Sequence, residues 1–367
     1  MSGAQRPIHA RYQIWGDPAE AAARAHALAV EQTHEFPTEL AEVSTLEALG
    51  IVTDLTTTGP ETTLATIAYP TPATGAELPQ LLVMLFGNCS LLPGIRLVDL
   101  DVPDTFAAEL DGPRFGMAGL RRLFDAPSRP LLATALKPMG LDPKQLADIA
   151  YQMAASGIDI IKDDQGLANQ AWAPFEDRVR ACAEAVQRAN TETGGRTIYM
   201  PSLNVPAGDL EARIATAVDA GVGGFLVLPG ITGFDSVGYA ASTGLPMMAH
   251  PTFLGSFVTS PTSGIAHGVL FGPLMRLAGA DATIFPNHGG RFSFSPLECE
   301  QIASACGSQL GGLEPIAPTP GGGMSLDRVP EMVEFYGRDV VLLIGGELHR
   351  GDLRRNGERF RQLINGV

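Results

Sequence analysis

The sequence lacks an excess of basic residues, a long apolar run and closely spaced cysteines. Its 367 residues carry 40 acidic against 25 basic side chains, a net charge of −15. A nucleic acid or an anionic membrane would therefore meet a repulsive average field. No apolar run reaches the roughly 18 to 20 residues that a membrane helix needs. These absences favour a soluble protein whose partner is a small molecule.

The cysteines and the N-terminal segment indicate the cellular compartment in which the protein is expected. Cys89, Cys182, Cys299 and Cys306 lie far apart and form no CxxC pair, which excludes a zinc knuckle and a disulfide scaffold. The opening segment MSGAQRPIHARYQIWGD lacks the basic, apolar and small-residue order of a signal peptide. We therefore expect a cytoplasmic protein.

The chain is long enough for one large domain or two ordinary ones, and its pattern changes near residue 113. In residues 1–112, the alternating HARYQIW predicts a strand, and Asp17 and Pro18 then begin an Ala-rich helix. IVTDLTTT, TTLATIAYP and PQLLVMLFG are β-rich runs separated by Gly and Pro. This pattern predicts a smaller α+β N-terminal domain with a mainly antiparallel sheet.

Residues 113–367 repeat a different unit, an apolar run followed by a turn and a helical segment. The helical segments include PKQLADIAYQMAAS, EDRVRACAEAVQRAN, DLEARIATAVDAG and HGVLFGPLMRLAGA. Eight such runs separated by helices predict an α/β fold with a C-terminal (β/α)8 TIM barrel. The runs are LLATAL, IDII, TIYMPSL, GFLVLPG, PMMAH, ATIF, EPIAP and VVLLIGG.

Polar and glycine residues follow these runs, and the ends of parallel barrel strands meet at one rim, where chemistry takes place. Two glycine turns on adjacent strands offer backbone N–H groups to an anion, which predicts a phosphorylated substrate. The rim residues are Lys137, Lys162, Asp163, Asp164, Gln165, Asn204, His250, His288, Arg291, Gly321, Gly322, Gly323, Gly345 and Gly346.

The IKDD segment that ends the second run has three chemical interpretations. Lys162 is an ion-paired lysine, a Schiff-base nucleophile, or a lysine carbamylated by CO2 that binds Mg²⁺ together with a carboxylate. A solvated strand end is the simpler interpretation of an isolated tetrapeptide. Its place at the rim of a barrel favours a functional role.

Three further rim residues also have a structural and a functional interpretation. Lys137 is either a surface lysine before Pro138 or a partly desolvated lysine that abstracts a proton. His250 is either a satisfied core histidine or a site residue. Arg291 lies in a Gly-rich loop, where its guanidinium fork suits a phosphate, and we favour that role.

These motifs, in this order, resemble the large subunit of ribulose-bisphosphate carboxylase, and specifically its non-carboxylating RuBisCO-like branch. MLFGNCSLLPGIRLVDLDVP resembles the end of that family's N-terminal domain and places Asn88 at a substrate- and metal-contacting position. LKPMGL resembles the family's IKPKLGL, which implies that Lys137 removes the enolisable proton. GIDIIKDDQ implies that carbamylated Lys162, Asp164 and Gln165 hold Mg²⁺.

The same resemblance implies roles for residues outside these three motifs. It implies that His250 binds substrate or phosphate, that Arg291 replaces a flexible-loop lysine, and that the two glycine turns cradle a phosphate. We also expect Asn204, at the end of the third run, to bind substrate. Glu31 in AVEQTHEF matches an acidic residue that reaches the neighbouring subunit's site, which implies a homodimer with shared active sites.

Three residues that differ from the family pattern reduce the number of reactions that the protein is expected to catalyse. Met139 replaces a second lysine, Gln165 replaces a carboxylate and Arg291 replaces the lysine that steadies CO2. The resemblance therefore implies enolisation without carboxylation, with either weaker Mg²⁺ binding at Gln165 or a site that works without a metal. We expect an isomerase of 5-methylthioribulose 1-phosphate in methionine salvage. The alternatives are a decarboxylase of a 3-oxo sugar-acid phosphate, a diketo-phosphate enolase, and a sugar-phosphate binder without turnover.

Overall fold

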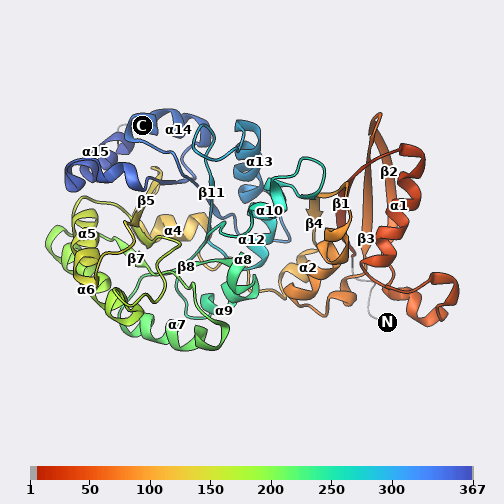
Figure 1. Ribbon diagram of the computed structural model, residues 1–367, viewed down its shortest axis with the longest axis horizontal. Helices are drawn as coiled ribbons and strands as arrows, with labels where there is room; N and C mark the ends of the chain where they lie inside the picture. Colours follow the sequence, from red (N-terminus) through yellow and green to blue (C-terminus); the bar gives the residue numbers. More distant parts are fainter. Residues whose placement is uncertain (1–5, 366–367) are drawn as a thin grey trace.

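The computed structural model describes residues 6–365 and shows an α/β chain with a small sheet beside a parallel barrel (Figure 1). The small sheet has the order β10-β4-β1-β3-β2 and is antiparallel except where β10 joins β4. Because β10 comes from the second half of the chain, it ties the barrel to this sheet. The strands are β1 (Ile8–Trp15), β2 (Ile51–Gly59), β3 (Thr62–Tyr69), β4 (Ile95–Asp101) and β10 (Gly264–Ile265).

Helix α1 (Pro18–Glu31) follows β1 as the sequence predicts. The side chain of Asp17 accepts a hydrogen bond from the backbone N–H of Ala19 at 2.9 Å, and Pro18 occupies the first helical position. The helix packs against β2 and β3 and buries Ala21, Ala25, Leu28 and Ala29. Its end at Glu31 places that carboxylate beside the start of η4 (Asn88–Leu91).

The third β-rich run of the first half is a helix, so that prediction was wrong. Residues Leu78–Phe86 form α2, with Pro79 in its first turn. The buried residues Leu78, Leu81 and Leu85 follow a helical spacing. A short continuous apolar run does not distinguish a buried strand from a buried helix, and leucine and methionine favour the helix.

All eight predicted barrel strands are present, and they form two four-stranded parallel arcs. One arc has the order β13-β5-β6-β7 and the other β12-β11-β9-β8. The bridge between Ser202 and Leu226 joins the arcs on one side. On the other side β12 pairs only with β11, because Pro318 and Pro320 leave β12 with few N–H donors. The strands are β5 (Leu131–Leu136), β6 (Ile160–Asp163), β7 (Ile198–Met200), β8 (Phe225–Val227), β9 (Met247–Ala249), β11 (Ala282–Pro286), β12 (Ala317–Gly321) and β13 (Val341–Leu343).

Helices surround these strands and cover their outer faces (Figure 1). The predicted segment HGVLFGPLMRLAGA is helical, but it contains a π-helical turn (Leu270–Leu274) around Pro273, which lacks the N–H that an α-helix requires. The main helices are α5 (Pro143–Ala155), α6 (Phe175–Thr193), α7 (Leu210–Asp219), α9 (Asp235–Ala241), α13 (Pro296–Gly307), α14 (Val329–Tyr336) and α15 (Leu353–Asn365). Shorter helices are α3 (Asp104–Ala107), α8 (Pro229–Thr232), α10 (Gly255–Val258), α11 (His267–Val269) and α12 (Met275–Leu277), the last two on either side of the π-helical turn.

One end of the barrel is closed by helix α4 (Gly116–Phe124). Its Met117, Leu120 and Phe124 join the inward-facing strand residues in one buried cluster. The buried carboxylate of Asp281 fixes the start of α4 by accepting hydrogen bonds from the backbone N–H groups of Phe115 and Gly116. The opposite end, where the strands end, is therefore left for a site.

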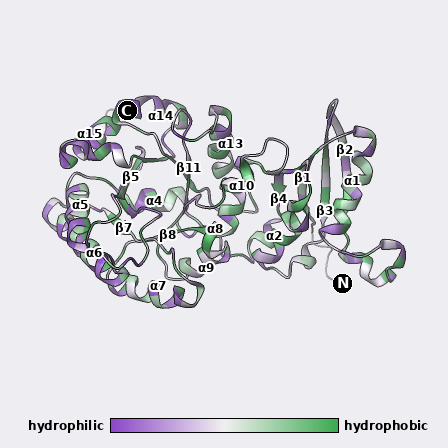
Figure 2. Ribbon diagram, in the orientation of Figure 1, coloured by the Kyte–Doolittle hydropathy of each residue, from purple (hydrophilic) through white to green (hydrophobic). Residues whose placement is uncertain are grey.

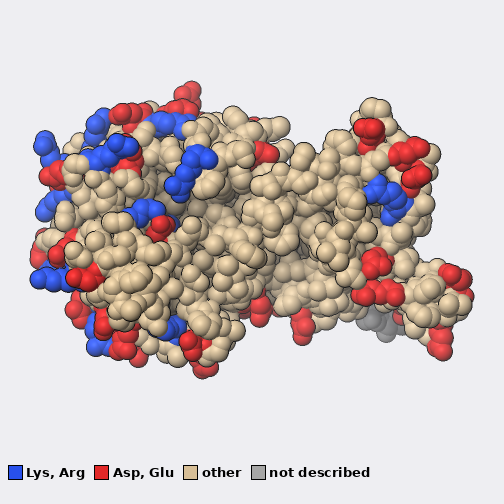
Figure 3. All heavy atoms as spheres, viewed as in Figure 1, with Lys and Arg blue, Asp and Glu red and all other residues tan. Residues whose placement is uncertain are grey.

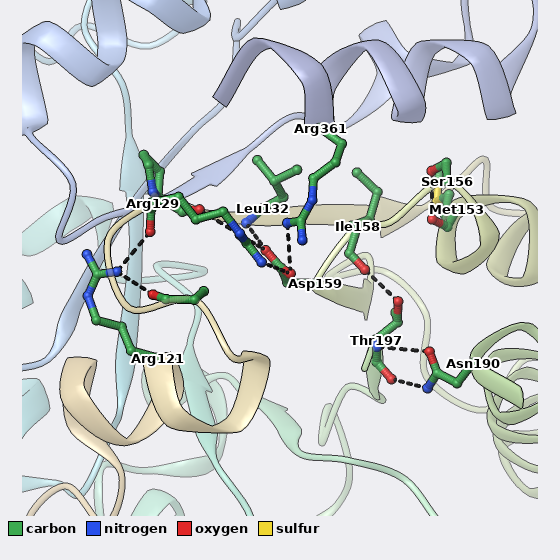
Figure 4. A network of polar contacts seen from close by, with 12 residues as sticks. Arg121, Arg129, Leu132, Met153, Ser156, Ile158, Asp159, Asn190, Thr197 and Arg361 are labelled. Atoms are coloured by element: carbon green, nitrogen blue, oxygen red, sulfur yellow. Dashed lines mark hydrogen bonds and ion pairs between the residues drawn. The ribbon is translucent and has the colours of Figure 1, made fainter. Parts of the chain in front are cut away.

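A polar network ties the strand starts to the last helix (Figure 4). The carboxylate of Asp159, just before β6, accepts hydrogen bonds from Arg129 at 2.7 and 2.8 Å and from Arg361 of α15 at 3.3 Å. It also accepts the backbone N–H of Leu132 in β5 at 2.9 Å. This network lies away from the strand ends and holds the barrel together.

The distribution of apolar residues agrees with this architecture. Figure 2 shows hydrophobic residues along the central strands and hydrophilic residues on the outer sides of the helices. Within residues 6–365, no helix is long and apolar enough to cross a membrane.

Candidate active site

A cavity of about 960 Å³ opens where the barrel strands end. It contains most of the residues that the sequence singled out, and they come from β5, β6, β9, β11, β12 and β13 or from the loops that follow them. The predicted residues that line it are Lys137, Lys162, Asp164, Gln165, His250, Arg291, Gly321, Gly322, Gly323, Gly345 and Gly346.

Two lysines share one carboxylate inside this cavity. The Nζ atom of Lys137 lies 2.5 Å from Oδ2 of Asp164, and that of Lys162 lies 3.8 Å from Oδ1. Burial lowers the pKa of Lys162 from 10.5 to about 8, although the charge of Asp164 opposes this shift. Burial raises the pKa of Asp164, but the charges of Lys162 and Lys137 outweigh it and hold that pKa below its usual value. The site therefore contains an amine that loses its proton at mildly alkaline pH.

The neighbouring Asp163 has a structural role. Its fully buried carboxylate accepts hydrogen bonds from Arg178 at 3.1 Å, from the Tyr199 hydroxyl at 2.7 Å and from the backbone N–H of Ser202 at 3.0 Å. Successive side chains of a strand point to opposite faces, so Asp163 braces β6 while Lys162 and Asp164 face the cavity.

His250, Thr252 and Gln165 form a hydrogen-bonded chain at the cavity wall. The backbone N–H of Thr252 lies 3.2 Å from Nδ1 of His250. The Thr252 hydroxyl lies 2.6 Å from the same Nδ1 and also contacts Oε1 of Gln165. Burial lowers the pKa of His250 to about 3, helped by the charge of Lys162. His250 is therefore a neutral imidazole in the cavity wall.

The two glycine turns lie within the cavity wall. Gly323 has a φ of +79°, and a Cβ there would lie 2.5 Å from the Cα of Gly290. A Cβ on Gly345 would lie 3.2 Å from Cε of Lys137. Gly323 therefore excludes a side chain, whereas a side chain at Gly345 would require Lys137 to shift. Bare backbone at these turns lets N–H groups approach an anion.

Besides Asp163 and the rim residue His288, three predicted residues do not line the cavity of this chain. Asn204 donates to the backbone carbonyl of Gln165 at 3.3 Å and braces the loop after β6. Glu31 and Asn88 lie in the N-terminal part and bond to each other, with Nδ2 of Asn88 2.9 Å from Oε1 of Glu31. The cavity of a single chain therefore lacks the last two.

The sequence analysis missed residues on the loops around the cavity. Thr252 follows β9, Phe292 and Phe294 belong to the loop after β11, and Glu347, His349 and Arg350 follow the β13 glycine turn. One overlooked signal is the scarcity of lysine. The chain has only Lys137, Lys144 and Lys162, and two of these three line the cavity.

Comparisons with known proteins agree with this architecture. The family model for the ribulose bisphosphate carboxylase large chain, catalytic domain, matches residues 116–292. The chain is 44% identical to the 5-methylthioribulose-1-phosphate isomerase of Rhodospirillum rubrum, over 93% of this chain and 91% of that protein. It is 33% identical to the 2,3-diketo-5-methylthiopentyl-1-phosphate enolase of Bacillus pumilus, over 82% of this chain and 76% of that protein.

A solved structure extends the agreement to the whole fold. The Rubisco-like protein from Rhodopseudomonas palustris superposes with a TM-score of 0.89 at 41% identity, and the match covers 99% of each chain. Together with the replacements at Met139, Gln165 and Arg291, these similarities establish the family. The chain belongs to the RuBisCO-like, non-carboxylating branch of the ribulose bisphosphate carboxylase large-chain family.

Proposed function

We propose that this protein is an isomerase that converts 5-methylthioribulose 1-phosphate into a 1-methylthio-pentulose 5-phosphate. The observation that carries the proposal is the pairing of Lys137 with Asp164 in a cavity that also contains two glycine turns. Once the Lys137 amine has given its own proton to solvent, it can take a proton next to a ketone, with Asp164 stabilising the ammonium ion that forms. The turns suit a phosphate. The 44% identity to the Rhodospirillum rubrum isomerase supports the same substrate.

The proposed reaction moves a ketone two carbons along the chain. Lys137 takes the proton from the carbon beside the ketone, and the C–H electron pair forms the double bond of an enediolate. Return of the proton to the former carbonyl carbon places the ketone one position further. A second cycle places it on the carbon that bears the methylthiomethyl group. The net change needs no oxidant and no second substrate.

The cavity also suits a substrate with one phosphorylated end and one apolar end. The glycine turns after β12 and β13 offer backbone N–H groups to the phosphate. Apolar side chains from the π-helical turn, α10, β11 and the following loop form another part of the wall. They are Val258, Phe271, Ile284, Phe285, Phe292 and Phe294. A thioether would gain free energy by leaving water there.

The donor set fits Mg²⁺, which we propose as the cofactor. Asp164 and Gln165 offer oxygen atoms, and Lys162 becomes an oxygen ligand once its neutral amine adds CO2. A pKa of about 8 makes that amine available near neutral pH. When bound, Mg²⁺ supplies positive charge for the enediolate oxygens.

We propose further that the active unit is a homodimer in the cytoplasm. Glu31 and Asn88 are hydrogen-bonded to each other outside the cavity of their own chain. We therefore infer that both contribute to the cavity of a second copy. The large apolar residues Val83, Leu91 and Leu92 near Asn88 are exposed. Figure 3 shows few charges between the barrel and the outer end of the N-terminal sheet. The four cysteines are buried and unpaired, which suits a reducing compartment.

A diketo-phosphate enolase is the second candidate, because the Bacillus pumilus relative shares 33% identity. An enolase performs one proton abstraction and leaves the product as the enol. It therefore needs the same base and phosphate site but no second proton transfer. The two candidates differ in whether the ketone moves along the carbon chain.

Proton NMR in deuterated buffer tests the proposal. The protein is incubated with 5-methylthioribulose 1-phosphate, with and without Mg²⁺ and bicarbonate. We expect a new methylthio-pentulose phosphate that carries solvent deuterium. Conversion of only the 2,3-diketo-5-methylthiopentyl 1-phosphate would assign the enolase, and release of CO2 from a 3-oxo sugar-acid phosphate would assign the decarboxylase. Binding without exchange of any proton would leave a sugar-phosphate-binding protein.

A further inference from the structure

Phe294 is an aromatic side chain of the cavity wall near the end of the loop after β11. Its ring lies 6.2 Å from the ring of Phe271 in the π-helical turn, centroid to centroid, and both rings line the cavity. Helix α10, which contributes Val258 to the wall, and the π-helical turn contain no charged residue. This part of the wall therefore suits the uncharged, apolar end of a substrate.

A buried histidine packs against Phe294. The rings of His267 and Phe294 meet edge to face, with 4.5 Å between their centroids and 83° between their planes. This arrangement is favourable for a pair of aromatic rings. His267 itself is buried and does not line the cavity of this chain. It can therefore restrict the position of the Phe294 ring without touching a substrate.

Glu298 contacts both His267 and the residue that follows Phe294. Its Oε2 accepts a hydrogen bond from the backbone N–H of Ser295 at 2.7 Å, and the side chain of Ser295 caps the start of α13. Its Oε1 lies 3.5 Å from Nδ1 of His267. A capping box of this kind satisfies N–H groups that the start of a helix would otherwise leave unpaired. The loop after β11 is therefore anchored directly beside Phe294.

The N-terminal sheet provides a further contact to His267. Nη2 of Arg96 in β4 lies 3.4 Å from Nδ1 of His267, and Nη1 donates to the backbone carbonyl of Ser260 at 2.7 Å. Burial lowers the pKa of His267; the charge of Glu298 opposes this shift and that of Arg96 adds to it. The ring is therefore neutral at pH 7, and its packing against Phe294 buries no charge.

The other phenylalanine of this loop, Phe292, has different neighbours. A Cβ on Gly322 would lie 3.3 Å from the ring of Phe292. The guanidinium group of Arg291 lies 5.0 Å from the centroid of the same ring. Phe292 therefore packs against the glycine turn after β12, where we place the phosphate, whereas Phe294 packs against the π-helical turn.

We propose that Phe294 is the specificity-determining residue for the methylthio end of the substrate, and that His267 is the positioning residue that holds its ring in the cavity wall. The inference rests on the proposed function. A methylthio group leaves water when it packs against Phe294, and sulfur makes favourable contacts with aromatic rings. A hydroxyl group on the same carbon would lose its hydrogen bonds to water there. The cavity should therefore prefer 5-methylthioribulose 1-phosphate to ribulose 1-phosphate.

Phe294→Ala tests the proposal on these two compounds, which differ only at the carbon that bears the methylthio group. We expect kcat/KM for the methylthio compound to fall about 10- to 100-fold through a higher KM, with kcat within about threefold, because the lost contact is made both before and during the reaction. For ribulose 1-phosphate, kcat/KM should change less than about threefold. If that compound is bound without turnover, its inhibition constant replaces KM.

Two control variants accompany Phe294→Ala. Phe292→Ala should weaken both compounds by the same factor, because both carry the phosphate. Tyr239→Ala, which removes an exposed ring on α9 outside the cavity, should match the wild type. An unchanged preference for the methylthio compound in Phe294→Ala, or an equal loss on both compounds, would overturn the role of Phe294.

His267→Leu and His267→Phe separate positioning from folding. Both variants lose the contacts with Glu298 and Arg96, but only phenylalanine keeps a ring against Phe294. We expect the preference for the methylthio compound to fall at least about threefold in His267→Leu and to return toward the wild-type value in His267→Phe. Equal preferences in the two variants would show that the ring of His267 does not position Phe294.

The outcome for the wild type distinguishes the two proposals. If the wild type isomerises neither compound, the proposed function fails and this inference fails with it. If the wild type is active but shows no preference for the methylthio compound, or if Phe294→Ala keeps that preference, only the inference fails.

Discussion

Lys137 and Asp164 are joined across the cavity, with 2.5 Å between Nζ and Oδ2, although they belong to different strand ends. Lys162 approaches the other oxygen of the same carboxylate at 3.8 Å. One carboxylate therefore balances two amines, one of which is almost fully buried. Any change in the charge of Asp164 or Lys162 must alter the surroundings of Lys137, which makes this group the electrostatic centre of the site.

Replacement of Lys137 by alanine should abolish most turnover. Loss of a positioned acid–base group lowers kcat by about 10²- to 10⁴-fold, and we expect the proton exchange with solvent deuterium to fall with it. Lys144, the third lysine of the chain, is exposed on α5 and provides the control Lys144→Ala. Full turnover by Lys137→Ala would show that another group is the base.

Replacing Asp163 should mainly lower stability, whereas replacing the adjacent Asp164 should mainly lower activity. Asp163 is buried against Arg178, and removal of one partner of a buried ion pair costs about 3 to 5 kcal/mol. The free energy of unfolding of Asp163→Ala, measured in urea, should be lower by that amount. Asp164→Asn should lose less stability than that, because its pair with Lys137 is partly exposed and the buried Lys162 can release its proton instead of remaining an unpaired charge, yet it should lose turnover. Equal stability losses would contradict this division.

The buried amine of Lys162 should make stability depend on pH. Its pKa is about 8 in the fold and 10.5 ordinarily, so below pH 8 the fold bears the full cost of burying the charge, about 3 kcal/mol. Between these pKa values the unfolded chain binds more protons, so stability rises with pH. Above 10.5 the cost is gone.

Lys162→Met lacks this titration and provides the comparison. In CO2-free buffer the variant should gain stability relative to the wild type at pH 7, and the gain should shrink by about 3 kcal/mol toward pH 10.5. Urea unfolding at several pH values measures it. A difference that stays constant with pH would mean that folding leaves the pKa of Lys162 at its ordinary value.

The barrel was predictable from sequence because its strands are continuous apolar runs, and eight such runs with intervening helices are typical of a closed parallel sheet. Helix α2 was not predictable, since the hydrophobic pattern of PQLLVMLFG does not distinguish a helix from a strand. The KDD motif located the site, but the opposite orientations of Asp163 and Asp164 required coordinates. His349 was missed because a single histidine after a glycine turn forms no motif.

The turn after β12 should tolerate no side chain. Gly323→Ala places a methyl group 2.5 Å from the Cα of Gly290, so the turn must shift and its N–H groups must leave the phosphate position. We expect KM for the phosphorylated ketose to rise at least about tenfold, or about 1.4 kcal/mol. Gly194→Ala, at a φ of +70° with open space around it, controls for backbone strain. An unchanged KM for Gly323→Ala would remove this turn from phosphate binding.

Mixing two inactive variants should reveal whether active sites are shared between subunits. Glu31 lies outside the cavity of its own chain, whereas Lys137 lies inside. If the dimer shares its sites, a mixed dimer of Glu31→Ala and Lys137→Ala contains one site with both residues intact. Random re-association should then restore about a quarter of wild-type sites, as a two-fold symmetric dimer requires.

The same mixture gives no recovery if each site is built from one chain, because every chain then carries a defect. The two variants are therefore unfolded together, refolded and assayed against separately refolded samples. Size-exclusion chromatography establishes that both form dimers. If Glu31→Ala alone keeps full turnover, Glu31 has no part in the site. If it is inactive and the mixture stays inactive, Glu31 acts within its own chain, which would require the N-terminal part to move toward the barrel.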